Sequence, residues 1–166
     1  DEPTIEAANA LAVDFAAVGN HEFDQGWQEL LRLAHGGCER YTTRQPCQLS
    51  KPFAGAKFPL LAANVHQSDG APLLPATGLK TFGQPGQQVT IGFIGMTLQA
   101  TPKLVTASAV QGLRFADEAS TANALVPQLL AQGADVIAVL LHEGGSTRTA
   151  PFSAGCDGLS GAIVPI

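Results

Sequence analysis

The chain has 166 residues, of which 45% are hydrophobic and 14% charged, and its formal net charge is −5. This composition excludes a disordered chain and fits one globular domain with a buried core. Its nine Lys and Arg residues are scattered, which argues against a nucleic-acid surface, and no apolar run is long enough for a membrane span.

The first third of the chain predicts two helices with a short buried strand between them. Residues 5–13 are expected to close an amphipathic helix, and the apolar run 15–18 to form a strand. Apolar residues then recur at helical spacing over 27–34, with polar Gln28, Glu29 and Arg32 between them. His35, followed by two glycines, is typical of a helix end.

The rest of the chain predicts further buried strands and one long helix. Strands are expected at 58–65, 79–82, 89–96 and 135–141. A helix is expected over 117–132, kinked or restarted at Pro127 and stopped by Gly133. Asn64 fits either a turn or a supporting place beside a site, and His66 is expected at the surface. Strands that alternate with helices predict an α/β sandwich.

The three cysteines favour one disulfide. Cys38 and Cys47 flank a polar loop that a disulfide would close in an oxidising compartment, and two reduced loop thiols are the alternative. Cys156 would then be free or paired with a cysteine outside this chain. No Cys-x-x-Cys pair is present to favour a zinc site. The pairing indicates a periplasmic or extracellular location.

One short motif places an amide, an imidazole and a carboxylate within one turn at the end of the first predicted strand. It reads Gly19-Asn20-His21-Glu22, followed by Phe23 and Asp24. Asp24 fits either a partner of His21 or a cap of the following helix. His21 fits either a reactive group or a loop histidine bonded to the backbone.

A second ligand-type side chain, His142, follows the predicted strand 135–141. A single histidine at a strand end is more often structural. Sites in open α/β sheets, however, gather at the carboxyl ends of strands. Asn20, His21 and His142 are therefore expected to converge, although about 120 residues separate them in the sequence.

Four segments together resemble a known family. They are 19–26 (GNHEFDQG), 58–65 (FPLLAANV), 91–97 (IGFIGMT) and 139–145 (VLLHEGG). In this order they are similar to the catalytic domain of calcineurin-like metallophosphoesterases, in the 5'-nucleotidase branch that includes enzymes opening 2',3'-cyclic nucleotides. The resemblance implies a β-sandwich flanked by helices (αββα). It also implies two divalent metal ions that hold a hydroxide for attack on the phosphorus of a nucleotide.

The resemblance also implies roles for four side chains. Asn20 and His142 would be ligands of the second metal ion. His21 would stabilise the transition state or protonate the leaving group, and Asp24 would orient His21. An amide oxygen combined with an imidazole favours zinc, manganese or iron over calcium.

The chain departs from the family pattern at both ends. The Asp-x-His and Gly-Asp motifs that should precede the first motif have no match in residues 1–18, and the terminal Gly-His-x-His is absent. Residues 1–166 are therefore expected to be an internal fragment of one catalytic domain, with partial or no metal occupancy and little or no hydrolysis. The C-terminal domain that selects the substrate in this branch is also expected to lie outside this chain.

Two other interpretations remain open. One is a secreted nuclease or a sugar-nucleotide hydrolase of the same superfamily. The other is a non-catalytic α/β binding module.

Overall fold

The computed structural model describes residues 1–48, 51–148 and 157–166. Within these ranges, the helices are α1 (Glu2–Ala10), α2 (Trp27–His35) and α3 (Glu118–Ala131). The strands are β1 (Ala16–Ala17), β2 (Leu60–Leu61), β3 (Val65–Gln67), β4 (Thr77–Phe82), β5 (Val89–Met96), β6 (Leu113–Phe115) and β7 (Val136–Leu141). Short 3-10 turns are η1 (Asn20–Phe23), η2 (Thr101–Lys103) and η3 (Ala107–Val110). No helix in the described ranges has the length and apolar character needed to cross a bilayer.

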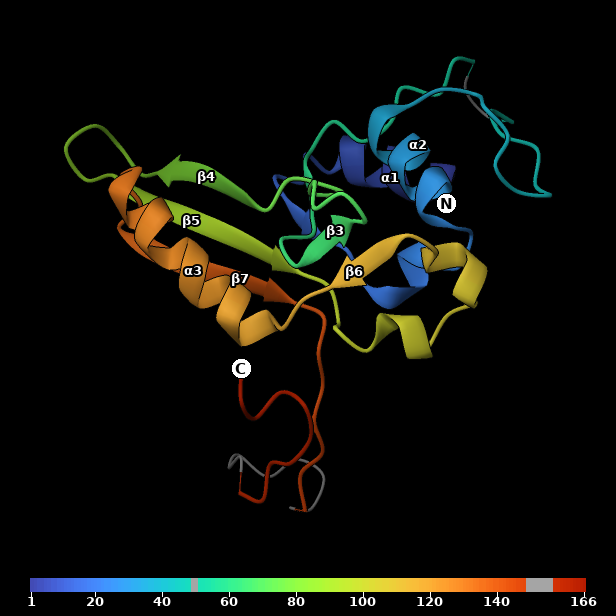
Figure 1. Cartoon of the computed structure of the whole chain (residues 1–166). Coiled ribbons are helices and arrows are strands. Elements are labelled where there is room, and N and C mark those ends of the chain that lie inside the picture. The colour runs from blue at the N-terminus through green and yellow to red at the C-terminus, as the bar shows by residue number, and fades with distance from the viewer. Residues whose placement is uncertain (49–50, 149–156) are drawn as a thin grey trace.

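The strands form three small sheets (Figure 1). In the largest sheet, the central strand β5 pairs with β4 in antiparallel and with β7 in parallel orientation. β1 and β2 form a parallel pair, and β3 and β6 form an antiparallel pair. Because β1 and β7 belong to different sheets, their carboxyl ends share no hydrogen-bond ladder.

The two faces of β5 contact different layers of the molecule. Ile94 and Met96 pack in one core with α3 residues, among them Leu129. On the opposite face, the Phe93 ring lies 5.0 Å from that of Phe15. Gly95 lies so close to the β1–β2 pair that an added Cβ would overlap Leu61.

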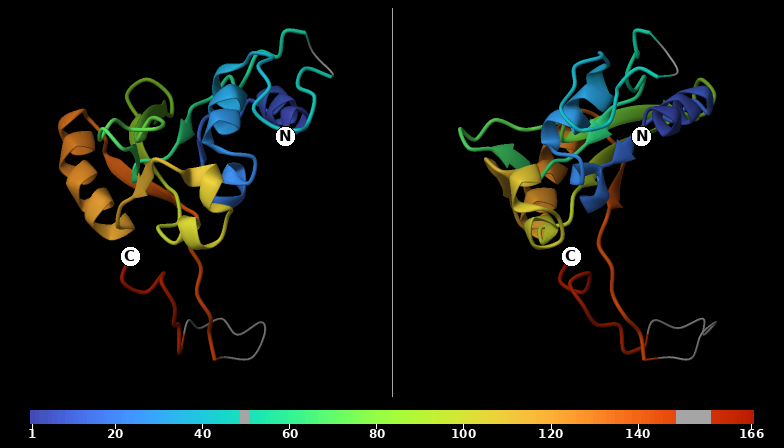
Figure 2. Two further views of the ribbon diagram at one scale, coloured as in Figure 1. Left: turned by 45° about the vertical axis from the view of Figure 1, so that its right-hand side comes forward. Right: turned by 90° about the vertical axis from the view of Figure 1, so that its right-hand side faces the viewer.

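The β1–β2 pair is covered in turn on its other side. Ala16 and Leu60 share a second core with apolar residues of α1 and α2, such as Ile5 and Leu30. The order of layers is therefore α3, the β4–β5–β7 sheet, the β1–β2 pair, and the helices α1 and α2 (Figure 2). This confirms the predicted α/β fold of two sheet layers flanked by helices.

Several predicted elements are confirmed, with small shifts at their ends. β5 spans the predicted residues 89–96, and α2 ends at His35 as expected. α3 begins after Asp117, whose carboxylate accepts the N–H of Ser120 at 2.8 Å, and Gly133 follows it with φ of 95°. The helix continues through Pro127 without restarting.

Other predictions were wrong in extent. The run 58–65 is not one strand, because the chain turns at residues 62–64 between β2 and β3. β1 has two residues rather than four, and α1 ends at Ala10 rather than Val13. His66 is half-buried rather than exposed, and its Nδ1 is enclosed without a hydrogen-bond partner in the described part of the chain.

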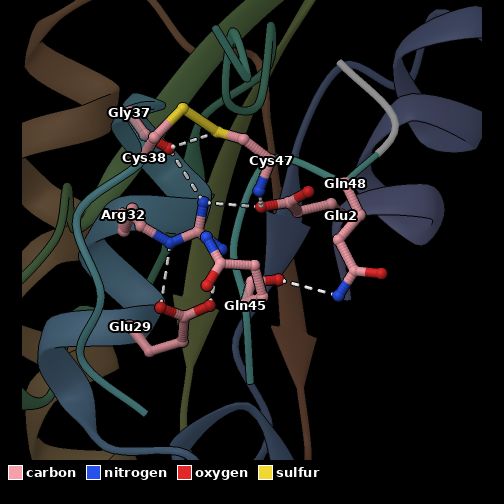
Figure 3. The surroundings of a disulfide bond; sticks show 8 residues. All are labelled: Glu2, Glu29, Arg32, Gly37, Cys38, Gln45, Cys47 and Gln48. Carbon is pink, nitrogen blue, oxygen red and sulfur yellow. Dashed lines mark hydrogen bonds and ion pairs between the residues drawn. A yellow bond between two sulfur atoms is a disulfide. The ribbon is translucent and has the colours of Figure 1, made fainter. Parts of the chain in front are cut away.

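The predicted disulfide between Cys38 and Cys47 is present and closes the loop that follows α2 (Figure 3). The backbone N–H of Cys47 donates to a carboxylate oxygen of Glu2 at 2.9 Å, so the loop is also attached to α1. Cys156 lies outside the described residues.

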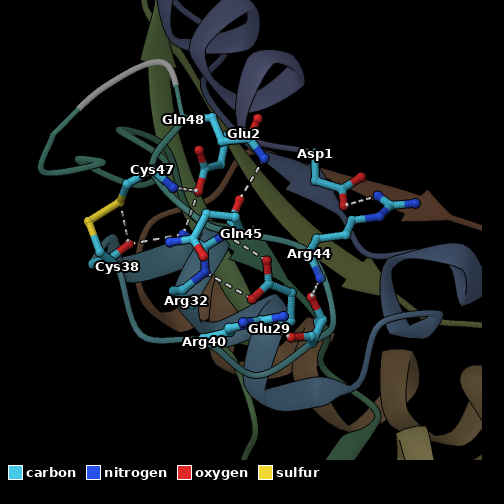
Figure 4. A network of polar contacts seen from close by, with 12 residues as sticks. Asp1, Glu2, Glu29, Arg32, Cys38, Arg40, Arg44, Gln45, Cys47 and Gln48 are labelled. Atoms are coloured by element: carbon cyan, nitrogen blue, oxygen red, sulfur yellow. Dashed lines mark hydrogen bonds and ion pairs between the residues drawn. A yellow bond between two sulfur atoms is a disulfide. The ribbon is translucent and has the colours of Figure 1, made fainter.

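A buried arginine connects this loop with both N-terminal helices (Figure 4). The side chain of Arg32 is 3% exposed and donates to both carboxylate oxygens of Glu29, at 2.6 and 2.9 Å. It also pairs with Glu2 at 2.8 Å and donates to the carbonyl of Gly37 at 2.9 Å. Hydrogen bonds and charge from Glu29 and Glu2 raise the pKa of the Arg32 guanidinium above its ordinary value.

Candidate active site

The first motif forms the 3-10 turn η1 at the end of β1. The Glu22 carboxylate folds back to accept the N–H of Gly19 at 2.8 Å, which closes the start of the turn. A Cβ added at Gly19 would lie 3.0 Å from two ring atoms of His142. Glycine at this position therefore lets the His142 ring lie against the backbone of the motif.

Asn20 and His142 meet across 122 residues of sequence. The Oδ1 of Asn20 lies 2.9 Å from the Nε2 of His142. Asn20 is 8% exposed, whereas His142 follows β7 and is exposed. Because an amide oxygen only accepts hydrogen bonds, the Nε2 of His142 carries the proton in this contact. The structure thus brings these two residues together as their places at strand ends predict.

His21 and Asp24 form a second pair on the same turn. The Nδ1 of His21 lies 2.9 Å from Oδ2 of Asp24, and the two side chains are 78% and 46% exposed. The hydrogen bond and the negative charge of Asp24 raise the pKa of His21 above its ordinary value of 6.5. Since a carboxylate only accepts, Nδ1 carries a proton, and Nε2 is the nitrogen left to act.

The alternative reading of Asp24 as a helix cap was wrong. α2 begins at Trp27 with Gly26 as its N-cap, so the N-cap position of α2 has no side chain to make a capping bond. Asp24 instead ends the 3-10 turn and contacts His21. Among the described residues, no hydrogen bond joins the His21–Asp24 pair to Asn20 or His142.

A polar contact that sequence reasoning missed lies behind the site. Thr97 is fully buried directly after β5, and its hydroxyl donates to the carbonyl of Val18 at 2.9 Å. The place of Thr97 directly after a largely apolar predicted strand is the sequence feature that could have indicated a buried hydroxyl here.

Asn20 and His142 offer two ligand-type atoms, an amide oxygen and an imidazole nitrogen. Their separation of 2.9 Å is the length of the hydrogen bond between them, and the Nε2 of His142 would have to lose its proton to bind an ion. Within the described residues, no group of three or more His, Cys, Asp or Glu side chains could hold an ion.

Known proteins with similar sequences include both nucleases and nucleotidases, although no family model matches the chain. An uncharacterized protein in the pqq-V 5' region of Acinetobacter calcoaceticus is 54% identical over 85 residues, or 50% of this chain and 42% of that protein. Endonuclease YhcR of Bacillus subtilis is 36% identical over 86% of this chain and 11% of its own length. A 5'-nucleotidase of Diplobatis ommata is 33% identical over 83% of this chain and 21% of its own length.

Solved structures give the decisive comparison. The calcineurin-like phosphoesterase YfkN of Bacillus subtilis superimposes with a TM-score of 0.67 at 27% identity, over 93% of this chain and 42% of that one. The chain matches part of a calcineurin-like phosphoesterase. A 5'-nucleotidase precursor of Thermus thermophilus superimposes with a TM-score of 0.61 at 25% identity, over 84% of this chain and 23% of that one.

The comparisons confirm the resemblance to calcineurin-like phosphoesterases of the 5'-nucleotidase and 2',3'-cyclic-nucleotide phosphodiesterase type. Such relatives are hydrolases by name. The chain spans less than half the length of each of these proteins. The roles of Asn20, His21, Asp24 and His142 remain predictions.

Proposed function

We propose that this chain supplies part of the active site of a dimetal phosphohydrolase that removes phosphate from nucleotides. The main substrates would be nucleoside 5'-monophosphates, with 2',3'-cyclic nucleotides as a second class. The observation that carries the proposal is the contact of 2.9 Å between Asn20 and His142, because two strand ends converge there with ligand-type atoms. Residues 1–166 would be an internal part of one catalytic domain.

In this proposal, Asn20 and His142 hold one of the two ions. An amide oxygen and an imidazole nitrogen suit zinc, manganese or iron better than calcium. Divalent ions in such a site activate water and neutralise the charge of phosphoryl oxygens.

His21 is the proposed acid of the reaction. Because Asp24 holds Nδ1–H, Nε2 is the ring nitrogen that would face the phosphoryl group. In the protonated ring, Nε2–H can donate to a phosphoryl oxygen as negative charge develops or pass its proton to the leaving oxygen. Asp24 stabilises the protonated ring and fixes its orientation.

The experiment measures phosphate release from AMP and from 2',3'-cyclic AMP by the full-length protein with added manganese or zinc. His21→Asn is expected to lower kcat by about 10²–10⁴, and Asn20→Ala or His142→Ala to weaken metal binding. His35→Asn is the matched control, because His35 is exposed at the end of α2. No metal binding and no turnover by the full-length protein would contradict the proposal and favour a non-catalytic binding module.

The chain of residues 1–166 alone is proposed to bind metal weakly and to release little phosphate. Only two of the proposed metal ligands lie in it, and the bridging carboxylate that the family resemblance implies has no match. Robust turnover of AMP or bis-p-nitrophenyl phosphate by this chain would contradict this part of the proposal.

A second candidate substrate class is a nucleic acid, because a relative with 36% identity is named an endonuclease. The net charge of −5 opposes binding of a polynucleotide backbone. The same assay with single-stranded DNA and RNA separates the two candidates. If the nucleotidase proposal is right, the protein should hydrolyse AMP and 2',3'-cyclic AMP faster than DNA or RNA.

A periplasmic or extracellular location is part of the proposal. The disulfide between Cys38 and Cys47 supports it, because such bonds persist in oxidising compartments. A relative in Listeria monocytogenes is named a cell wall protein. A separate C-terminal domain is proposed to select the nucleotide.

A further inference from the structure

A buried polar bridge lies directly behind the candidate site. Asn64 and Thr97 are both fully buried. The side-chain amide of Asn64 donates to the carbonyl of Thr97 at 2.6 Å, and its Oδ1 accepts the Thr97 N–H at 2.9 Å. The same amide also donates to the carbonyl of Ala116 at 3.0 Å. Asn64 is therefore bonded on both sides of its amide group.

The hydroxyl of Thr97 extends this bridge to another sheet. It donates to the carbonyl of Val18 at 2.9 Å. Val18 follows β1 and precedes the Gly19–Asn20 step of the site, whereas Thr97 follows β5. The bridge thus crosses from the β4–β5–β7 sheet to the β1–β2 pair.

The bridge also lies beside the strand end that carries His142. β7 pairs with β5 in parallel, with Leu141 opposite Met96. The N–H of His142 points to the carbonyl of Met96 at 3.4 Å, one residue before Thr97. Thr97 therefore directly follows Met96, whose carbonyl lies near the N–H of His142. The hydroxyl of Thr97 contacts Val18, two residues before Asn20.

We propose that Asn64 and Thr97 are positioning residues that set the distance between Asn20 and His142. This inference rests on the proposed function, because it assigns a purpose to the geometry of that site. The strand ends lie in separate sheets, so their relative position is fixed by contacts between the layers. A buried polar group that loses its hydrogen-bond partner costs free energy, because water cannot replace the partner. Small displacements of the strand ends relative to each other are therefore unfavourable.

The expected effect is large at the site because ligand pairs tolerate little displacement. Residues that support metal ligands without touching the ion typically change metal affinity about 10–100-fold when they are replaced. Thr97→Val keeps the shape of the side chain and removes its hydroxyl, which leaves the carbonyl of Val18 without this donor. Thr97→Ser keeps the hydroxyl and is the conservative variant.

A matched control is available in the same region. Thr101 is also fully buried, and its hydroxyl donates to the carbonyl of Leu98 at 2.6 Å. That bond closes the local turn from Leu98 to Thr101 and reaches neither β1 nor β7. Thr101→Val therefore removes an equivalent buried hydroxyl without touching the proposed bridge.

The test uses the full-length protein and manganese ions alone as the probe. Calorimetric titration is expected to give about 10–100-fold weaker manganese binding for Thr97→Val. Thr97→Ser and Thr101→Val should bind as the unchanged protein does. If Thr97→Val does not fold, Thr97→Cys replaces it, because its thiol is a weaker hydrogen-bond donor that still places a polar group near the carbonyl of Val18.

A second readout works on the metal-free protein. Side-chain ¹H–¹⁵N spectra, with His142→Gln for assignment, report the proton on Nε2 of His142 and hence its contact with Asn20. Thr97→Val should shift or broaden this signal, whereas Thr101→Val should leave it unchanged.

The outcomes separate the inference from the proposed function. If Thr97→Val lowers the unfolding midpoint like Thr101→Val but leaves both manganese affinity and the His142 signal unchanged, the bridge serves stability alone and the inference is overturned. If the unchanged protein binds no manganese and releases no phosphate, the proposed function fails. The His142 signal then still decides whether the bridge sets the contact.

Discussion

Replacing Arg32 by methionine should destabilise the fold strongly. Methionine retains an unbranched apolar stem and removes the charge. Arg32 is 3% exposed between two carboxylates that are 10% and 11% exposed, on Glu29 and Glu2. Removing one partner of such a buried ion pair costs about 3–5 kcal/mol, because the charges left behind are neither solvated nor paired. This is a large part of the roughly 5–15 kcal/mol by which domains are stable.

Urea unfolding followed by tryptophan fluorescence is a suitable assay. The chain has a single tryptophan, Trp27, at the start of α2, five residues before Arg32. The free energy of unfolding in water is compared between the unchanged protein and Arg32→Met. Adding Glu29→Gln to Arg32→Met should recover part of the loss, because it removes one of the unpaired charges.

Arg44→Met is the control for this experiment. Arg44 pairs with Asp1 at 3.0 Å, but the two side chains are 65% and 44% exposed. Exposed pairs contribute about 0–1 kcal/mol, since water competes for both charges. If Arg32→Met costs no more than Arg44→Met, the charges around Arg32 are solvated and the reasoning is refuted.

Three further predictions concern other parts of the molecule. Replacing Cys38 and Cys47 together by serine should lower the free energy of unfolding by about 2.7 kcal/mol, because the disulfide no longer closes a loop of about ten residues in the unfolded chain. If reduction of the disulfide leaves the free energy of unfolding unchanged, this prediction is wrong. Asp24→Asn should lower the pKa of His21 toward 6.5, because the raised pKa depends on that charged acceptor; histidine NMR titration of the metal-free protein measures it, and an unchanged pKa would show that Asp24 does not act on the ring. The hydrogen bond at the N-cap of α3 lowers the pKa of Asp117 below 3.8. The stabilisation of α3 by Asp117 is therefore full above pH 3.8 and is lost as the pH falls through the lowered pKa. Melting curves of Asp117→Ala should differ from those of the unchanged protein at pH 7 and converge with them in strong acid.

Local patterns in the sequence predict those elements whose ends are set by local chemistry. β5 was predicted over its full length, because eight successive residues with little polarity need cover on both faces. The extent of α3 was predicted from leucines and alanines at helical spacing, and its end from Gly133, which acts within one turn of the helix. The meeting of Asn20 and His142 was also predictable, because it follows from their places after two strands.

Features that depend on distant partners were not predictable in this way. The run 58–65 reads as one apolar strand, but its Asn64 bonds to Thr97 and Ala116, far along the chain, and the backbone turns there. Arg32 lies on the polar side of an amphipathic pattern, yet Glu2 and Gly37 enclose it. In both cases the polar side chain is buried because its partners come from other segments.

The outer edge of β7 has a practical consequence for handling this chain. In the described ranges, β7 pairs only with β5, so its other side presents unpaired backbone groups. Val136 and Val139 on this strand are 49% and 42% exposed. An open strand edge flanked by valines is a template for addition of a strand from another molecule, and it favours aggregation. A lysine at position 139 would oppose such pairing in concentrated samples.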